Sequence, residues 1–261
     1  MDLKLEGKTA LVTGATAGIG LAIAETLAAE KARVIITGRN REKLDEARRA
    51  MPAGAEVETV VVDITSAADT PKLFEAVPQV DILVNNLGIY EAKNFTDITD
   101  EDWLKIFNAN VLSGVRLTRY YLLRMFEQDF GRVIFISSES ALLVPTDMIH
   151  YAMTKTAQLT IARGLAETTK GTNVTVNSVM PGPTHSENIV DFMRQSLNDY
   201  ESSEEEIERA FFSKMRPTSL LQKLIQPSQI GRLVAFLASP LSGATNGAAL
   251  RSEGGLLQTI V

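Results

Sequence analysis

The sequence of 261 residues contains no cysteine, one tryptophan and only two histidines, His150 and His185. Without cysteine the chain has no disulfide, no thiolate metal ligand and no cysteine nucleophile. Two histidines are too few for a histidine-rich metal site, so we predict that the protein binds no metal. We expect both histidines to lie at the surface or at the rim of a pocket, without a role in catalysis.

Long apolar runs are also missing, because no segment approaches the roughly 18 consecutive apolar residues of a membrane span. The N-terminal segment carries acidic residues and lacks the basic stretch and apolar run of a signal peptide. A net charge of −6 and a pI of about 5.1 disfavour binding to nucleic acid or anionic lipid. We therefore expect a cytoplasmic protein that binds neither nucleic acid nor membranes.

What the sequence does contain is a regular alternation of short β-branched apolar runs with helical patterns. The runs predict strands at 9–14, 33–38, 57–63, 80–86, 131–138, 172–182 and, shorter, within 247–255. Helical patterns lie between or after them, at 18–32, 41–51, 66–76, 100–127, 150–169 and 227–238. Continuously apolar strands are typical of a parallel sheet covered by helices on both faces. We predict one α/β domain over residues 1–261, with a single doubly wound, Rossmann-like parallel sheet, although a flavodoxin-like or TIM-type arrangement would fit this rhythm alone.

The first predicted strand runs into the segment TGATAGIG (13–20), in which Gly14, Gly18 and Gly20 precede a helix. Glycine permits sharp turns and close backbone approach, and a helix N-terminus offers unpaired N–H groups to a pyrophosphate. The spacing G-x-x-x-G-x-G differs from the common dinucleotide fingerprint G-x-G-x-x-G. The position of the turn favours dinucleotide binding. The alternative is that the glycines only shape a tight connection between strand and helix.

The end of the second predicted strand bears on the choice of cofactor. NAD-binding folds usually place an acidic residue there for the ribose 2′-OH, whereas NADP requires a cation for its 2′-phosphate. This strand ends with Gly38 and Arg39, and a guanidinium group suits phosphate. We predict NADP(H), with NAD(H) as the less favoured cofactor. The alternative is that Arg39 is a solvated loop residue.

Tyr151 and Lys155 lie four positions apart, a spacing that places both side chains on one face of a helix. Further motifs accompany this pair in chain order: TGATAGIG (13–20), NNLG (85–88), Asn110, Ser138 and PGPT (181–184). In this combination the chain resembles the short-chain dehydrogenase/reductase family over essentially its whole length. The resemblance implies a catalytic tetrad of Asn110, Ser138, Tyr151 and Lys155, and assembly as a homotetramer or homodimer.

The same resemblance implies a set of cofactor contacts. The glycine turn would lie near the phosphates, Asp63 near the adenine amino group, and the PGPT segment near the nicotinamide. The implied set is Gly14, Thr16, Ala17, Gly18, Ile19, Gly20, Arg39, Asp63, Ile64, Asn86, Gly88, Tyr151, Lys155, Pro181, Gly182 and Thr184. One departure is Leu87, because the family usually has alanine there; it would narrow the pocket or alter local packing.

Hydride transfer belongs to the nicotinamide, and the resemblance implies how the protein handles the accompanying proton. Tyr151 would give a proton to a carbonyl oxygen in reduction and remove one in oxidation. Lys155 would lower the pKa of Tyr151 and hold the nicotinamide ribose. Ser138 would bind the substrate oxygen, and Asn110 would hold a water that links Lys155 to solvent. We predict an NADP(H)-dependent oxidoreductase for an apolar or mixed ketone or its secondary alcohol.

Residues 185–225 combine apolar stripes with the acidic run ESSEEEIE (201–208), in which Ser202 or Ser203 is a candidate helix cap. We expect a helical lid over the substrate, with ordinary core or subunit packing as the alternative. Two other functions stay open. A 3-oxoacyl-thioester reductase would favour a basic surface near the pocket, and a non-catalytic NADP-sensing regulator would tolerate loss of the Tyr-Lys pair.

Overall fold

The computed structural model describes residues 1–186 and 189–260, which form one seven-stranded sheet. The strand order is β3-β2-β1-β4-β5-β6-β7, and every neighbouring pair is parallel. The strands are β1 (Thr9–Thr13), β2 (Arg33–Gly38), β3 (Val57–Val61), β4 (Ile82–Asn85), β5 (Gly131–Ile136), β6 (Val174–Pro181) and β7 (Ala249–Ser252). This topology confirms the predicted doubly wound, Rossmann-like sheet.

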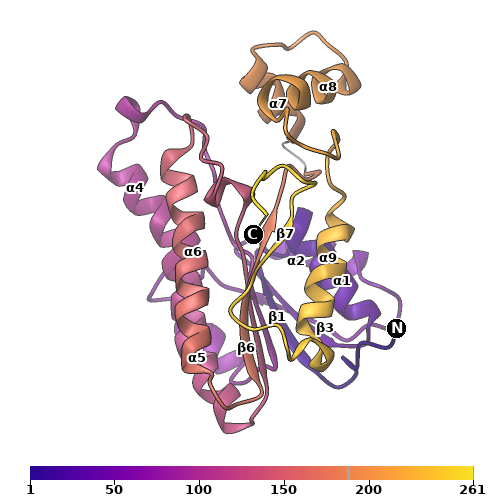
Figure 1. Ribbon diagram of the computed structural model, residues 1–261. Helices are drawn as coiled ribbons and strands as arrows, with labels where there is room; N and C mark the ends of the chain where they lie inside the picture. The colour runs from indigo at the N-terminus through magenta and orange to yellow at the C-terminus, as the bar shows by residue number, and fades with distance from the viewer. Residues whose placement is uncertain (187–188, 261) are drawn as a thin grey trace.

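Helices cover both faces of the sheet (Figure 1). Helices α1, α2 and α9 pack on one face, and α3, α5 and α6 pack on the other. The helices are α1 (Gly18–Ala29), α2 (Arg41–Ala50), α3 (Thr70–Ala76), α4 (Asp100–Phe107), α5 (Ser113–Glu127), α6 (Ile149–Thr168), α7 (Ile189–Leu197), α8 (Glu204–Met215) and α9 (Pro227–Ala238).

The two cores follow from the alternation of side chains along each strand, because neighbouring residues point to opposite faces. In β1, Ala10 and Val12 join the cluster that contains Ile23 of α1. Leu11, between them, joins the opposite cluster with Leu117 of α5. Since both faces of the central strands are buried, these strands are apolar without interruption, as the sequence pattern indicates.

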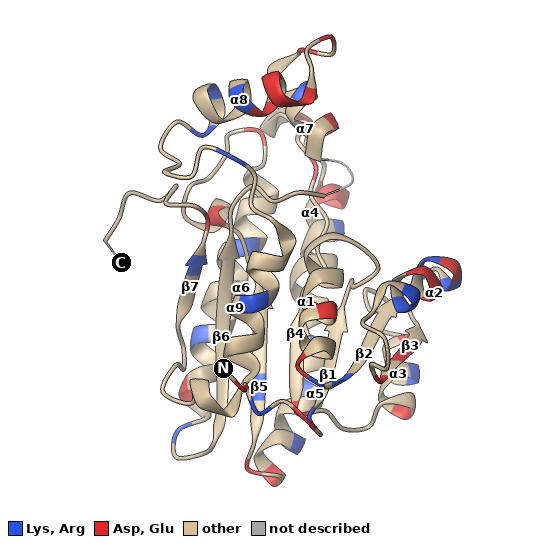
Figure 2. Ribbon diagram, turned by 90° about the vertical axis from the view of Figure 1, so that its right-hand side faces the viewer, with Lys and Arg blue, Asp and Glu red and all other residues tan. Residues whose placement is uncertain are grey.

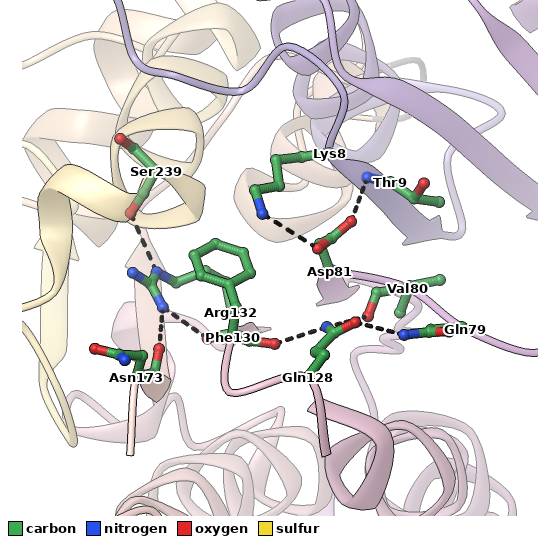
Figure 3. A network of polar contacts seen from close by, with 11 residues as sticks. Lys8, Thr9, Gln79, Val80, Asp81, Gln128, Phe130, Arg132, Asn173 and Ser239 are labelled. Atoms are coloured by element: carbon green, nitrogen blue, oxygen red, sulfur yellow. Dashed lines mark hydrogen bonds and ion pairs between the residues drawn. The ribbon is translucent and has the colours of Figure 1, made fainter. Parts of the chain in front are cut away.

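The amino ends of the strands are held together by a polar network (Figure 3). This end of the sheet is opposite to the carboxyl end of β1, where the glycine turn begins. Asp81 accepts hydrogen bonds from the backbone N–H of Thr9 at 2.8 Å and from Lys8 at 3.4 Å. The buried guanidinium of Arg132 donates to the carbonyl oxygens of Ser239 at 3.1 Å and Asn173 at 2.8 Å. These contacts connect segments that are far apart in sequence, so they fix the strand ends without taking part in the site described below.

The segment between β6 and α9 carries α7 and α8, which project beyond the carboxyl end of the sheet (Figure 1). The apolar side chains of these two helices bury one another, with Met193 of α7 against Phe211 and Phe212 of α8 in a separate cluster. Ser203 caps α8 and forms a reciprocal capping box with Glu206. Two residues of the expected lid, 187 and 188, lie outside the described residues.

No helix within the ranges 1–186 and 189–260 is long and apolar enough to cross a membrane. The described residues also contain no group of three or more His, Asp or Glu side chains placed to hold a metal ion.

Candidate active site

The strand order reverses between β1 and β4, and a crevice opens beyond the carboxyl ends of these two strands. The glycine turn follows β1 at this point, with Gly14 and Gly18 at positive φ angles of 62° and 56°. Helix α1 then begins after Ala17, whose side chain makes no capping hydrogen bond. The first N–H groups of α1 therefore remain free to receive an anionic group.

Gly20 and Asn86 fix the distance between the loops that follow β1 and β4. The amide nitrogen of Asn86 donates to the carbonyl oxygens of Thr13 at 2.9 Å and Gly14 at 3.1 Å. A Cβ atom on Gly20 would lie 2.4 Å from that same nitrogen and 2.4 Å from the Gly14 oxygen. Glycine is therefore required at this position by close approach, in addition to the turn itself.

A cleft of about 710 Å³ extends from the glycine turn toward the ends of β2 and β3, and its walls include Gly14, Thr16, Arg39, Asp63 and Ile64. Partial burial acts to raise the pKa of Asp63, but hydrogen bonds from Thr65 and the charge of Arg39 lower it overall. The Arg39 guanidinium lies 4.0 Å from the Asp63 carboxylate, and its side chain is 77% exposed. The free N–H groups at the base of the cleft suit the pyrophosphate of a dinucleotide, whereas the Asp63 carboxylate suits a hydrogen-bond donor such as an amino group of its base.

A second cleft of about 300 Å³ shares Tyr90 with the first and contains the remaining predicted residues that face a cavity. Its walls include Ala17, Ile19, Gly20, Asn86, Gly88, Ser138, Tyr151, Gly182 and Thr184. Thr184 is buried, and its hydroxyl donates to the Gly182 carbonyl at 2.8 Å. Of the predicted site residues, Gly18, Asn110, Lys155 and Pro181 line neither cleft, and the Lys155 ammonium lies behind Gly88, 3.3 Å from where a Cβ on that glycine would stand.

Tyr151 and Lys155 share one face of α6, as their spacing predicts, and the Lys155 ammonium lies 5.6 Å from the centre of the Tyr151 ring. Lys155 is almost fully buried and donates to the Ile136 carbonyl, at the end of β5, at 2.9 Å. Burial lowers the pKa of Lys155 to about 8, although the negative charge of Glu139 opposes this shift. Lys155 is consequently mostly charged at neutral pH and loses its proton as the pH rises through about 8.

The pKa of Tyr151 is raised, opposite to the lowering expected from the sequence. Burial is the largest cause, the Glu139 charge adds to it, and a hydrogen bond with Ser138 acts in the other direction. The sequence pattern identifies the Tyr-Lys pair but cannot foresee this buried carboxylate beside it. A phenol with a raised pKa holds its proton, which suits the role of an acid.

Ser138 follows β5 and faces the same cleft as Tyr151. Its hydroxyl donates to the carboxylate of Glu139 at 2.6 Å and accepts from the N–H of Ser140 at 3.1 Å. Glu139 also lies 3.6 Å from the Nε of Arg216, at the end of α8. The segment after β5 therefore connects the predicted substrate-binding serine to the helices beyond the sheet.

Asn110 lies in a π-helical turn, Asn108–Leu112, that interrupts the helix expected at 100–127. Its side-chain oxygen accepts from the N–H of Ile89 at 2.7 Å, and its nitrogen donates to Thr154 of α6 at 3.0 Å. The side chain thus connects the segment after β4 to the catalytic helix. A side chain with such contacts to neighbouring segments is a usual accompaniment of a π-helical turn at a functional site.

Gln158 was not among the predicted site residues, yet it joins two of them. Its side-chain oxygen accepts from Lys155 at 3.2 Å, and its nitrogen donates to the main-chain carbonyl of Asn110 at 2.7 Å. Gln158 therefore connects the Lys155 ammonium to the main chain of Asn110, while the water expected at Asn110 stays a prediction. The available signal was a polar residue three positions after Lys155, on the same face of the helix.

His150 is buried rather than exposed, but it lines the larger cleft, in keeping with the predicted pocket position, and His185 is exposed as expected. The His150 ring is buried against Trp103, with ring centres 5.9 Å apart. Leu87, where the family usually has alanine, lines the larger cleft and packs against the core beneath α5 and α6. It therefore both narrows the cleft and adds to local packing.

The parallel sheet thus carries Ser138 and Tyr151 on one cleft beside the glycine turn, with Lys155 close to the Tyr151 ring. The family model for short chain dehydrogenases matches residues 8–197. The chain therefore belongs to the short-chain dehydrogenase/reductase family, whose members are oxidoreductases that act on C–OH and C=O groups.

Individual relatives match the whole chain. It is 49% identical over 263 residues to the uncharacterized oxidoreductase YvaG of Bacillus subtilis (strain 168), covering 100% of both chains. It is 31% identical over 258 residues to the 3-oxoacyl-[acyl-carrier-protein] reductase FabG of Escherichia coli (strain K12), covering 97% of this chain and 99% of that one. L-sorbose reductase from Gluconobacter frateurii, solved with NADPH and L-sorbose, matches with a TM-score of 0.93 at 27% identity, over 100% of both chains.

Proposed function

We propose that this protein is an NADP(H)-dependent oxidoreductase that interconverts a ketone and its secondary alcohol, with Tyr151 as the acid and base. The observation that carries the proposal is the convergence of Ser138, Tyr151 and the buried Lys155 beside the glycine turn. A bound nicotinamide would supply or accept the hydride. The chain itself has to hold the substrate and handle the proton.

Each member of the proposed tetrad has a part that follows from its contacts. Tyr151 holds its proton because its pKa is raised, and it would deliver that proton to the carbonyl oxygen as negative charge develops there. Lys155 has three N–H donors, two of which are directed at Ile136 and Gln158. We assign the third to the ribose hydroxyls of the cofactor, which fixes the reacting ring beside Tyr151.

We assign NADP(H) rather than NAD(H) on the residues at the end of β2. Gly38 is followed by the exposed Arg39, and no carboxylate occupies the position that would bind a 2′-OH. A Cβ on Gly38 would lie 2.9 Å from the Thr16 side chain, so the strand end and the glycine turn approach closely. The presence of NADPH in the similar L-sorbose reductase structure supports this assignment.

The segment at about 185–225 is proposed as a substrate lid. Phe192 of α7, Phe211 of α8 and Arg216 line the same cleft as Tyr151. Because α7 and α8 bury their apolar residues on each other, they can move over the cleft without exposing the sheet core.

We also propose a homodimer or homotetramer in the cytoplasm. The strand β7 lies at the edge of the sheet with side chains that are only partly buried, and a second copy could cover it. Light scattering after size-exclusion chromatography would measure the number of chains in solution.

The experiment that tests the proposed function is a panel of ketones and secondary alcohols with NADPH and NADH, read by absorbance of the reduced cofactor. The wild-type protein should turn over at least one pair, and Tyr151→Phe should keep cofactor affinity within about threefold while losing turnover by about 10³-fold or more. Turnover by Tyr151→Phe at the wild-type rate would refute the assignment of the acid.

The similarity to FabG gives a second candidate, a 3-oxoacyl-thioester reductase. Three consecutive glutamates form the first turn of α8 beyond the cleft, Glu204, Glu205 and Glu206 (Figure 2). An acidic surface on a helix that contributes to the cleft does not favour an acidic carrier, so we prefer a free small-molecule substrate. A non-catalytic NADP sensor would bind the cofactor tightly and stay silent across the panel.

A further inference from the structure

The hydroxyl of Ser138 already has a strong acceptor before any substrate arrives. It donates to the Glu139 carboxylate at 2.6 Å, a short distance typical of a hydrogen bond to a charged oxygen. The N–H of Ser140 occupies one of its lone pairs. Glu139 is only 5% exposed, so this carboxylate depends on protein donors rather than on bulk water.

Reduction of a carbonyl requires the Ser138 hydroxyl to donate to the substrate oxygen instead of to Glu139. If Ser138 binds the substrate oxygen, its single proton has to turn away from Glu139 and toward the carbonyl. The nearest cation, the Nε of Arg216, lies 3.6 Å from the other carboxylate oxygen and makes no hydrogen bond among the described residues. A buried carboxylate that loses its donor is strongly disfavoured, so a replacement donor is required.

On the basis of the proposed function, we infer that the substrate supplies this donor through a hydroxyl on the carbon next to its carbonyl. Glu139 directly follows Ser138, and both line the cleft that contains Tyr151. A carbonyl oxygen held by Ser138 and Tyr151 would therefore bring an adjacent hydroxyl to the acceptor that Ser138 has just released. The substrate class is an α-hydroxy ketone, and the product is the corresponding vicinal diol.

The charges around the cleft favour a neutral hydroxyl over an ionic group. Glu139 and Arg216 are both largely buried and carry opposite charges, so the pair contributes no net charge to the cleft. A substrate carboxylate at this point would be repelled by Glu139, and an ammonium would be repelled by Arg216. An uncharged O–H group satisfies Glu139 without separating the pair.

The test compares matched ketones in which a methyl group replaces the hydroxyl, beginning with hydroxyacetone and butan-2-one. A site built to bind a hydroxyl discriminates strongly against the analogue that lacks it, because its own polar group is left unpaired. We expect kcat/KM of the wild-type protein with NADPH to favour the hydroxylated member by about tenfold or more in each pair that is turned over.

Substitution of the acceptor should remove this preference. In Glu139→Leu the ratio between paired ketones should fall to within about twofold of unity. Because that change leaves Arg216 without its counterion, Glu139→Leu/Arg216→Leu removes both charges and provides a second variant that is easier to fold. Glu204→Leu makes the same substitution on the exposed first turn of α8 and should keep the wild-type ratio.

Equal kcat/KM for both members of each pair in the wild-type protein would overturn the inference while leaving the oxidoreductase function intact. The same holds if either Glu139 variant keeps the preference. If no carbonyl or alcohol in the wider panel is turned over with either nicotinamide, the proposed function itself fails, and this inference fails with it.

Discussion

The Nζ of Lys155 lies 3.2 Å from the side-chain oxygen of Gln158, and the other end of the same carboxamide donates to the carbonyl of Asn110 at 2.7 Å. All three side chains are buried. The Gln158 side chain therefore connects the ammonium group to the π-helical turn through one hydrogen bond at each end of its carboxamide.

Gln158→Leu should shift the pH profile of the enzyme without unfolding it. Removal of an acceptor destabilises the charged form of Lys155, whose pKa burial already lowers to about 8, so this pKa falls further. If charged Lys155 is required, kcat/KM should decline at a lower pH on the alkaline side, by about half a unit or more. Kinetics between pH 6 and 10 with a saturating cofactor would measure the shift.

Gln158→Glu supplies a test of sign for the same contact. A carboxylate at this position favours the ammonium form, so the alkaline limb should move to higher pH, opposite to the leucine variant. Gln258→Leu, at an exposed position near the C-terminus, is the matched control and should leave the profile unchanged. Coincident profiles for all of these proteins would show that Gln158 does not tune Lys155.

Lys155→Met should change how stability depends on pH in the cofactor-free protein. Because the folded-state pKa of Lys155 is below the ordinary value of 10.5, the unfolded chain binds more protons between about pH 8 and 10.5. The penalty for burying the charge is therefore fully present below about pH 8 and disappears as the pH rises to 10.5. It amounts to about 3 kcal/mol at most, since one pKa unit corresponds to about 1.4 kcal/mol.

Denaturant unfolding of both proteins at pH 7 and pH 10 would measure this difference. The wild-type free energy of unfolding should gain more than the variant does on going to pH 10. The change in unfolding free energy between the two pH values is compared rather than the absolute stability, because methionine also removes the hydrogen bond to Ile136. A wild-type protein whose pH dependence matches that of Lys155→Met would contradict the lowered pKa.

Arg39→Ala should weaken NADPH binding by about tenfold to a hundredfold and leave NADH binding nearly unchanged. A charged hydrogen bond to phosphate contributes about 1.5–3 kcal/mol, and the 2′-phosphate is the group by which the two cofactors differ. Fluorescence titration with each reduced cofactor would give both affinities. Arg41→Ala is the matched control, because that side chain is directed to Thr59 of β3. An unchanged preference for either cofactor in Arg39→Ala would remove the basis for assigning NADP(H).

Gly20→Ala should abolish cofactor binding, because the added Cβ would lie 2.4 Å from both Asn86 and the Gly14 carbonyl. The control is Gly164→Ala on α6, where a Cβ meets no atom within 4 Å. That change should stabilise the helix by about 0.5–1 kcal/mol and leave binding intact. Calorimetric titration with NADPH and thermal unfolding of both variants would separate the two effects. Equal cofactor affinity in the two variants would contradict the close-approach argument.

Contacts within one element could be predicted from the sequence, and those between elements could not. The Tyr151–Lys155 pair follows from helical spacing, and the parallel sheet follows from the uninterrupted apolar strands. The role of Gln158 could not be predicted, because it depends on the packing of a π-helical turn against α6. The raised pKa of Tyr151 could not be predicted either, since Tyr151 is buried and lies near the Glu139 charge only after β5 and α6 have packed together.

The helices α7 and α8 bury their apolar side chains against each other, with Met193 beside Phe211, in a cluster distinct from both cores of the sheet. Because the cluster is separate, we expect mutations that reshape it to change the stability of the sheet little. If the segment is the proposed substrate lid, relatives with the same sheet and glycine turn can differ in the substrate that they recognise. Exchange of this segment between relatives would then transfer the preference for one carbonyl compound over another.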